Sequence, residues 1–154
     1  MAMMNLNEYG ILLVEDSSTD ILFIQRAFKQ ANIVNPVRIV RDGDEAVDYL
    51  AGQNGYGDRN QYPLPALILL DLKLPRRHGL EVLGWLKQQP GIKRIPVVVL
   101  TSSREDADID RAYDLGVSSY LVKPVELSAL NALVEKIDAY WLRTNEFPNI
   151  VAAS

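Results

Sequence analysis

Five short runs of mostly apolar residues recur along the chain, separated by longer amphipathic stretches. The runs cover residues 11–14, 37–40, 66–70, 97–100 and 119–122. Short runs with little polar alternation are typical of strands that are buried on both faces, as in a parallel sheet. The pattern therefore predicts five parallel strands.

The stretches between these runs carry apolar residues at helical spacing. Examples are Ile21, Ile24 and Phe28 after the first run, and Leu80, Leu83 and Leu86 after the third. Capping side chains at residues 17–20 open the first of these helices, and Gly116 is a C-terminal stop for the fourth. The last helix is expected over residues 127–142. Alternating strands and helices predict an α/β domain with a doubly wound, five-stranded parallel sheet and five helices.

One domain accounts for most of the chain. It is expected over residues 10–142, and the tail at 143–154 is too short to form an output domain. Residues 52–65 hold three glycines and two prolines among polar residues. We interpret this segment as a long loop within the domain, because a strand follows directly after it.

Composition and charge narrow the possible functions. The chain has 154 residues, a formal net charge of −4, no cysteine and one histidine, His78. Thiolate and histidine-built zinc sites are therefore excluded. The acidic balance argues against nucleic-acid binding. No apolar run approaches the roughly 18–20 residues that span a membrane, and the start of the chain does not resemble a secretory signal. We expect a cytoplasmic protein with neither a nucleic-acid nor a membrane partner.

Reactive side chains follow four of the five predicted strands. Glu15 and Asp16 follow the first strand, Asp71 the third, Thr101 the fourth and Lys123 the fifth. In open parallel sheets, ligands bind outside the carboxyl ends of the strands. We therefore expect these side chains to converge on one site.

The three carboxylates of this set point to a divalent cation. Carboxylates packed together disfavour each other's ionised forms, and a cation relieves that repulsion. Mg²⁺ prefers an octahedral shell of oxygen ligands. Asp16 and Asp71 are the expected carboxylate ligands, Glu15 is expected to act through water, and a backbone carbonyl near Lys73 can add another oxygen.

The same set of residues suits phosphoryl transfer. A carboxylate can attack phosphorus and form an aspartyl phosphate. The reaction otherwise requires positioning and neutralisation of the phosphoryl oxygens. Asp71 is the expected nucleophile, with Lys123 as the protein's cation and Thr101 as a hydroxyl donor.

Four motifs resemble those of two-component response regulator receiver domains. They are residues 13–17 (Leu-Val-Glu-Asp-Ser), 69–75 (Leu-Leu-Asp-Leu-Lys-Leu-Pro) with Gly79, 98–102 (Val-Val-Leu-Thr-Ser) and 120–124 (Tyr-Leu-Val-Lys-Pro). The resemblance implies a flavodoxin-like strand order of 2-1-3-4-5 and phosphorylation of Asp71 by a sensor histidine kinase. It also implies Mg²⁺ or Mn²⁺ bound by Glu15, Asp16 and Asp71.

The resemblance assigns further roles near the site. Thr101 and Lys123 would sense the phosphoryl group, and Tyr120 would be the aromatic switch residue that moves when Thr101 engages it. The Lys123–Pro124 peptide bond is expected to be cis. A receiver of this kind signals through protein contacts and is not an enzyme.

Two segments are similar to stand-alone regulators paired with bacterial phytochromes. These are the loop at residues 52–65 and the ending at 140–142 (Tyr-Trp-Leu), so a phytochrome is a candidate kinase. Apolar residues near the C-terminus exceed what one helix face can bury; they are Tyr140, Leu142, Phe147, Ile150 and Val151. They predict a homodimer through the last helix and tail, with a frayed tail as the alternative.

Two other functions compete with a phosphorylated switch. One is a pseudo-receiver that binds partners without being phosphorylated, against which the intact acidic set and Lys123 both argue. The other is a Mg²⁺-dependent phosphatase with an aspartate nucleophile, resembling the haloacid dehalogenase family. Such enzymes place a general acid two residues after the nucleophile, and this chain has Lys73 there.

Overall fold

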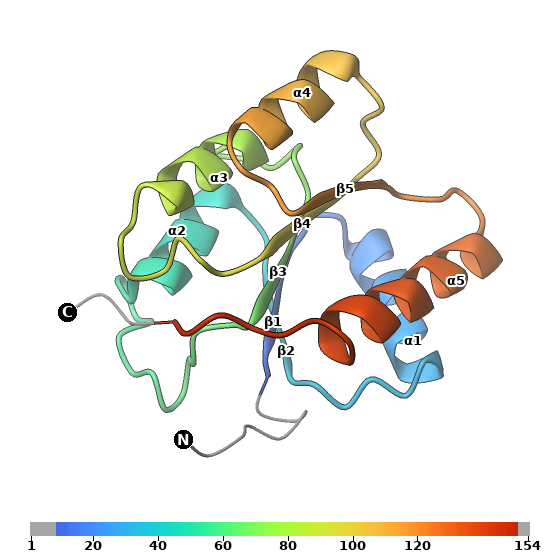
Figure 1. The fold of residues 1–154 in the computed structure, drawn as a ribbon, viewed down its shortest axis with the longest axis horizontal. Helices are drawn as coiled ribbons and strands as arrows, with labels where there is room; N and C mark the ends of the chain where they lie inside the picture. The colour runs from blue at the N-terminus through green and yellow to red at the C-terminus, as the bar shows by residue number, and fades with distance from the viewer. Residues whose placement is uncertain (1–8, 151–154) are drawn as a thin grey trace.

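The structure is a computed structural model and describes residues 9–150. Strands and helices alternate along the chain (Figure 1) in the order β1 (Ile11–Val14), α1 (Ser18–Gln30), β2 (Val37–Val40), α2 (Gly43–Ala51), β3 (Leu67–Leu70), α3 (Gly79–Lys87), β4 (Val97–Thr101), α4 (Asp106–Asp114), β5 (Ser119–Val122) and α5 (Leu127–Ile137). A short π-helix, η2 (Asp138–Leu142), continues α5. The five predicted strands are confirmed, each within one residue of its expected bounds.

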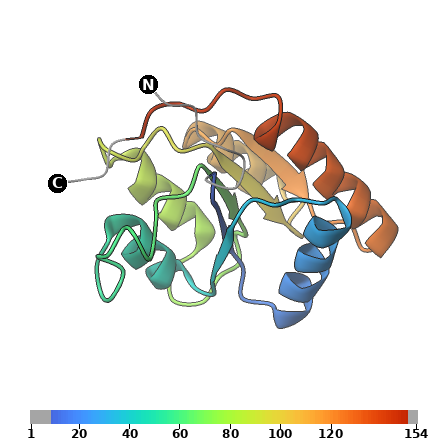
Figure 2. The same ribbon diagram turned by 90° about the horizontal axis from the view of Figure 1, so that it is seen from below.

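The five strands form one parallel sheet in the order β2-β1-β3-β4-β5. This is the order that the family resemblance implied. The sheet is sandwiched between two layers of helices, with α1 and α5 on one face and α2, α3 and α4 on the other (Figures 1 and 2). The fold is therefore a doubly wound α/β sandwich.

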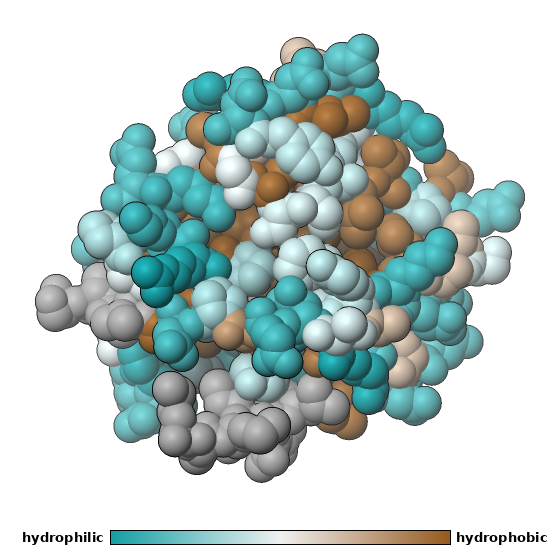
Figure 3. All heavy atoms as spheres, viewed as in Figure 1, coloured by the Kyte–Doolittle hydropathy of each residue, from teal (hydrophilic) through white to brown (hydrophobic). Residues whose placement is uncertain are grey.

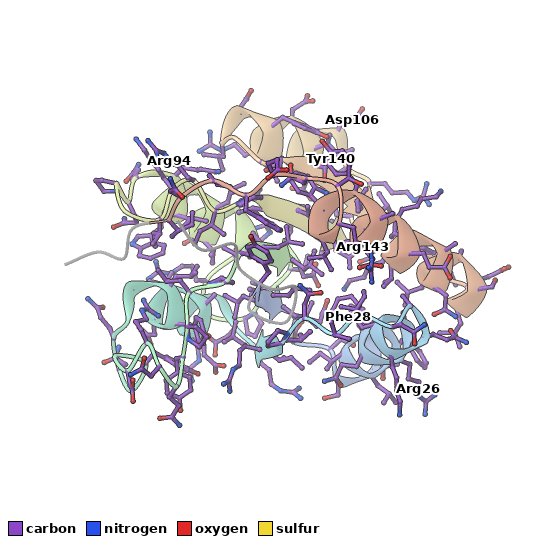
Figure 4. The ribbon with its side chains drawn as sticks, turned by 60° about the horizontal axis from the view of Figure 1, so that its bottom comes forward. Arg26, Phe28, Arg94, Asp106, Tyr140 and Arg143 are labelled. Atoms are coloured by element: carbon purple, nitrogen blue, oxygen red, sulfur yellow. The ribbon has the colours of Figure 1, made fainter. Side chains whose placement is uncertain are left out.

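Both faces of the sheet are buried, which explains the continuous apolar runs in the sequence. Leu12 and Val14 of β1 pack into the core beneath α2 and α3, whereas Ile11 and Leu13 pack against α1 and α5. In Figure 4, Phe28 of α1 points into the second of these cores. Side chains of successive strand residues point to opposite faces, so a strand buried on both sides needs an apolar residue at every position.

Local sequence sets where helices begin and end. Ser17 caps α1 by accepting a hydrogen bond from the backbone N–H of Asp20 at 3.2 Å. Gly116 follows α4 with a φ of 89°, a left-handed conformation that favours glycine. The expected stop at this residue is confirmed.

Arg59 anchors the long loop at residues 52–65 to the end of α2. Its guanidinium donates hydrogen bonds to the carbonyls of Tyr49 and Leu50, both at 2.8 Å, and to that of Tyr62 at 3.2 Å. The rings of Tyr49, Tyr56 and Tyr62 pack against one another. The loop is thus a fixed part of the domain.

The C-terminal helix is shorter than predicted. The regular α-helix ends at Ile137 instead of residue 142, and Leu127 at its start is 49% exposed. After η2 the chain crosses the amino-terminal edge of the sheet (Figure 1), where Phe147 stacks on Tyr9 with ring centroids 4.6 Å apart.

Much of the expected surplus apolar surface is therefore packed within the domain. Leu142 is buried, and Phe147 and Ile150 pack against the two cores. Tyr140 remains exposed, and Val151 lies outside the described residues. The expectation that all of these residues are spare was wrong, because the tail folds back over the sheet.

No helix within residues 9–150 is both long and apolar enough to cross a membrane.

Candidate phosphoacceptor site

The carboxyl ends of the strands bring the predicted residues together. Past β1 and β3, backbone hydrogen bonds continue for one more residue: Glu15 N–H donates to Val40 at 3.0 Å, and Asp71 N–H donates to Val14 at 3.0 Å. Lys123 follows β5 and its N–H donates to the Thr101 carbonyl at 2.8 Å. The backbone at Glu15, Asp71 and Lys123 is thus held by the sheet itself.

Glu15, Asp16 and Asp71 form an acidic cluster. Carboxylate oxygens of the three residues lie within 4.8 Å of one another. Glu15 and Asp71 are buried, and Asp16 is exposed. This set of hard oxygen donors fits Mg²⁺ or Mn²⁺ and offers none of the soft ligands that other metals prefer. The exposed Asp16 leaves the cluster open to solvent on one side.

Lys123 bridges the carboxylates of the site. Its Nζ donates hydrogen bonds to Asp20 at 2.9 Å, to Asp71 at 3.0 Å and to Glu15. An ammonium group has three N–H donors, so these three acceptors satisfy it. The Lys123 side chain is 10% exposed, and such burial of a cation requires paired charges of this kind.

Asp20 was missed as a site residue in the sequence, where it was interpreted as part of the capping segment. Asp20 lies in the first turn of α1, and no local pattern distinguishes it from an ordinary capping residue. Only the folded arrangement brings its carboxylate to Lys123, which follows β5.

The ionisation of the buried groups is set by their contacts. Burial raises the pKa of Glu15 to about 7, against the opposing effect of Lys123. Burial acts in the same direction on Asp71, but hydrogen bonding from Thr101 and the charge of Lys123 outweigh it and lower the pKa of Asp71. For Lys123, burial is outweighed by the carboxylates, which raise its pKa. At neutral pH, Asp71 is an ionised carboxylate and Lys123 a cation.

Thr101 and Tyr120 connect the site to the β4–α4 loop. Thr101 is fully buried, and its hydroxyl oxygen accepts a hydrogen bond from the Ser103 N–H at 3.4 Å. The Tyr120 hydroxyl donates to the Ser103 carbonyl at 2.9 Å, and the Ser103 hydroxyl donates to Asp108 of α4 at 2.6 Å. Ser103 thus joins both proposed switch residues to α4.

A close backbone contact shapes the loop after Asp71. The Leu72 N–H donates to the Asp71 carboxylate at 2.7 Å, and the Gly79 N–H donates to the Leu72 carbonyl at 2.7 Å. A Cβ at position 79 would lie 2.3 Å from the Asp71 carbonyl oxygen, so only glycine fits there. Lys73 is exposed in this loop, and metal binding by its carbonyl stays a prediction.

One sequence-based expectation about the neighbouring backbone is revised. No described peptide bond is cis, so the expected cis bond between Lys123 and Pro124 was wrong. The trans form is the more stable isomer of an X-Pro bond by about 0.5–1 kcal/mol, and Lys123 reaches its three carboxylates from it. His78 caps α3, because its Nδ1 accepts a hydrogen bond from the Leu80 N–H at 3.1 Å.

A doubly wound sheet with an acidic cluster, a buried lysine and a buried threonine at its ligand edge defines a receiver-type signalling domain. Residues 11–135 match the response regulator receiver domain family, and the chain belongs to this family.

Several known proteins are similar to this chain over most of its length. It is 44% identical to the response regulator Rcp1 of Synechocystis over 90% of this chain and 92% of Rcp1. It is also 44% identical to the probable methanogenesis regulatory protein FilR2 of Methanothrix harundinacea, over 90% of this chain and 86% of FilR2. The crystal structure of the phosphorylated cyanobacterial phytochrome response regulator RcpA superposes with a TM-score of 0.86 at 43% identity, covering 92% of this chain and 99% of RcpA.

Proposed function

We propose that this receiver accepts a phosphoryl group on Asp71 from a sensor histidine kinase in a Mg²⁺-dependent reaction. The observation that carries the proposal is the convergence of Asp71 with Glu15, Asp16 and Lys123. Two related structures support the proposal. Phosphorylated RcpA supports the phosphorylation, and the Mn²⁺-bound form of Rcp1 supports the need for a divalent cation.

The ionisation of Asp71 suits it to act as the nucleophile. Because its pKa is lowered, the carboxylate is already deprotonated at neutral pH and no base is needed. As its oxygen bonds to phosphorus, the P–N bond of the donor phosphohistidine breaks and the nitrogen keeps the bonding electron pair. Lys123, 3.0 Å from Asp71, neutralises phosphoryl oxygens on one side.

A divalent cation would be held by Glu15, Asp16 and Asp71, with the Lys73 carbonyl as a further candidate ligand. When bound, it would supply positive charge to the phosphoryl oxygens in addition to that of Lys123. Thr101 would donate its hydroxyl hydrogen to a phosphoryl oxygen, and Tyr120 would respond to that movement. The role of Tyr120 rests on the family resemblance.

The surface beside the site offers a place for the kinase. A cavity of about 280 Å³ runs from Lys123 between α1 and α5. Two exposed apolar residues line it: Val125 is fully exposed, and Leu127 is about half exposed. We propose that the kinase covers these residues. Val125→Ser should then slow transfer from the kinase and leave transfer from a small phosphodonor unchanged.

A phytochrome is our proposed source of the phosphoryl group. The description of RcpA as a phytochrome response regulator supports this source. However, FilR2, which is as similar in sequence to this chain as Rcp1 is, is described as a probable methanogenesis regulatory protein. Sequence identity alone therefore does not indicate which signalling pathway this protein serves. A photoreceptor histidine kinase encoded beside this gene, with light-dependent transfer to this protein, would support the assignment. Transfer only from a kinase that does not bind a chromophore would contradict it.

We also propose that output passes through protein contacts that include a homodimer. A groove of about 400 Å³ between β5 and α5 is lined by Leu121, Ile137 and Trp141, and Tyr140 stands 55% exposed beside it. Figure 3 shows hydrophobic surface between α4 and α5. Sedimentation should show a dimer that Tyr140→Ser weakens and Leu22→Ser, on α1, does not. A strict monomer with and without a phosphate mimic would contradict this proposal.

One assay separates this function from its two competitors. Wild-type protein is incubated with Mg²⁺ and acetyl phosphate, and bound phosphate is followed together with turnover. A switch takes up no more than one acid-labile phosphoryl group per chain, and Asp71→Asn takes up none. A pseudo-receiver takes up none in either form. Sustained hydrolysis of a phosphomonoester would instead favour the phosphatase, for which Lys73 supplies no general acid.

A further inference from the structure

We propose that Asp20 is a positioning residue that holds Lys123 in place for the phosphoryl group. This inference rests on the proposed function and adds a fourth carboxylate to the site. Asp20 Oδ2 lies 2.9 Å from Lys123 Nζ, as close as the Asp71 oxygen at 3.0 Å. The contact joins the first turn of α1 to the end of β5 across the ligand edge of the sheet.

The three carboxylates around Lys123 would have different roles once a cation and a phosphoryl group occupy the site. Asp71 gives up an oxygen to phosphorus, and Glu15 belongs to the cluster that would hold the cation. Asp20 is not a member of that cluster. It therefore remains the one carboxylate whose hydrogen bond to Lys123 does not compete with the ligands of the site.

The backbone that carries Asp20 is held in place by hydrogen bonds. Ser17 accepts the Asp20 N–H at 3.2 Å, and the Ser17 N–H donates to Glu15 at 3.1 Å. The helix cap and the buried Glu15 thus set the position of the first turn of α1. A lysine has four rotatable side-chain bonds, and a fixed anchor limits the positions that its ammonium group visits.

Anchoring Lys123 has a specific kinetic consequence. Phosphoryl transfer depends mainly on groups that are positioned before the reaction. Without Asp20, Lys123 would still be a cation, but it would be drawn toward Glu15 and Asp71 alone. We therefore expect the rate of phosphorylation to fall while the affinity for the cation changes little.

The test compares Asp20→Asn with a matched control. Glu126→Gln removes the same charge from the wall of the same cavity, and the described residues give Glu126 no side-chain hydrogen bond or ion pair. Phosphorylation by acetyl phosphate is measured at saturating Mg²⁺, and Mg²⁺ affinity by calorimetry. Asp20→Asn should slow phosphorylation about five-fold, as for loss of one partly exposed ion pair. Its Mg²⁺ dissociation constant should stay within about two-fold of the wild-type value, because a non-ligand charge in a solvated position acts weakly. Glu126→Gln should change neither quantity.

Asp20→Glu provides the conservative rescue. Its longer carboxylate can still reach Lys123, so it should recover most of the lost rate. The inference is overturned if Asp20→Asn is phosphorylated at the wild-type rate, if its Mg²⁺ affinity falls about ten-fold, or if Asp20→Glu is no faster than Asp20→Asn. Failure of the wild-type protein to accept phosphate would instead refute the proposed function.

Discussion

The contact between Gly79 and the end of β3 allows a sharp test of how the fold positions Asp71. In the Gly79→Ala variant, the new Cβ would lie 2.3 Å from the Asp71 carbonyl oxygen and 2.7 Å from the Leu72 Cα. Ordinary contacts begin at 3.4 Å, so the shortfall at the oxygen is 3.4 − 2.3 = 1.1 Å. Both clashing atoms are backbone, and α3 or the Asp71 loop must move to relieve them.

The expected loss of stability follows from this overlap. Forcing one extra carbon into a packed site costs about 1–3 kcal/mol. Gly84 offers a control in the same helix, because a Cβ there would lie 3.7 Å from Leu115, an ordinary contact. Gly84→Ala should stabilise the protein by about 0.5–1 kcal/mol through helix propensity. The free energies of unfolding of the two alanine variants should therefore lie on opposite sides of the wild-type value and differ from each other by about 1.5–4 kcal/mol.

Urea unfolding followed by circular dichroism measures both changes as shifts in midpoint at constant slope. Calorimetry should also show that Gly79→Ala weakens Mg²⁺ binding by roughly ten-fold, as expected when support behind metal ligands is disturbed. Gly84→Ala should bind Mg²⁺ normally. If Gly79→Ala is as stable as Gly84→Ala, the argument from close backbone contact is wrong.

Three further variants test separate parts of the structure. With a chelator present, the free energy of unfolding should fall as the pH rises from about 4.5 to about 7, because burial raises the pKa of Glu15 from 4.5 to about 7 and the folded state therefore binds that proton more tightly. Glu15→Gln should remove this pH dependence. An unchanged pH dependence in the variant would contradict the prediction. Arg59→Lys should lower stability by about 1–3 kcal/mol in urea unfolding, because one ammonium cannot replace a guanidinium bonded to three carbonyls. Tyr120→Phe loses one hydrogen bond, to Ser103, and should lower stability by about 0.5–1.5 kcal/mol in the same assay; an unchanged midpoint would show that this bond is not formed in solution.

The sequence was most informative where one physical constraint dominated. Strands buried on both faces must be apolar throughout, so five apolar runs located all five strands. The carboxyl ends of parallel strands necessarily share one edge, and this alone predicted that Asp71, Thr101 and Lys123 lie together. The strand order was different, because it came from the family resemblance and no local pattern specifies it.

Features that depend on tertiary packing were predicted less well. Asp20 has the local pattern of an ordinary capping residue, and only the folded arrangement brings its side chain to Lys123, which lies on a different element. The tail residues Phe147 and Ile150 looked like spare apolar surface, because nothing local shows that the chain turns back across the sheet. The expectation of a cis bond before Pro124 came from the family resemblance alone, and the described residues contain no cis bond.

The proposed function depends on Asp71 being the phosphoacceptor of a Mg²⁺-dependent switch. The sharpest test is the intact mass of the protein after incubation with acetyl phosphate, with Mg²⁺ or with chelator, followed by mapping of the modified residue. We predict one added phosphoryl group on wild-type protein, located on Asp71, that depends on Mg²⁺ and is absent from Asp71→Asn. A phosphoryl group on another residue, or an unmodified wild-type protein under these conditions, would contradict the proposal.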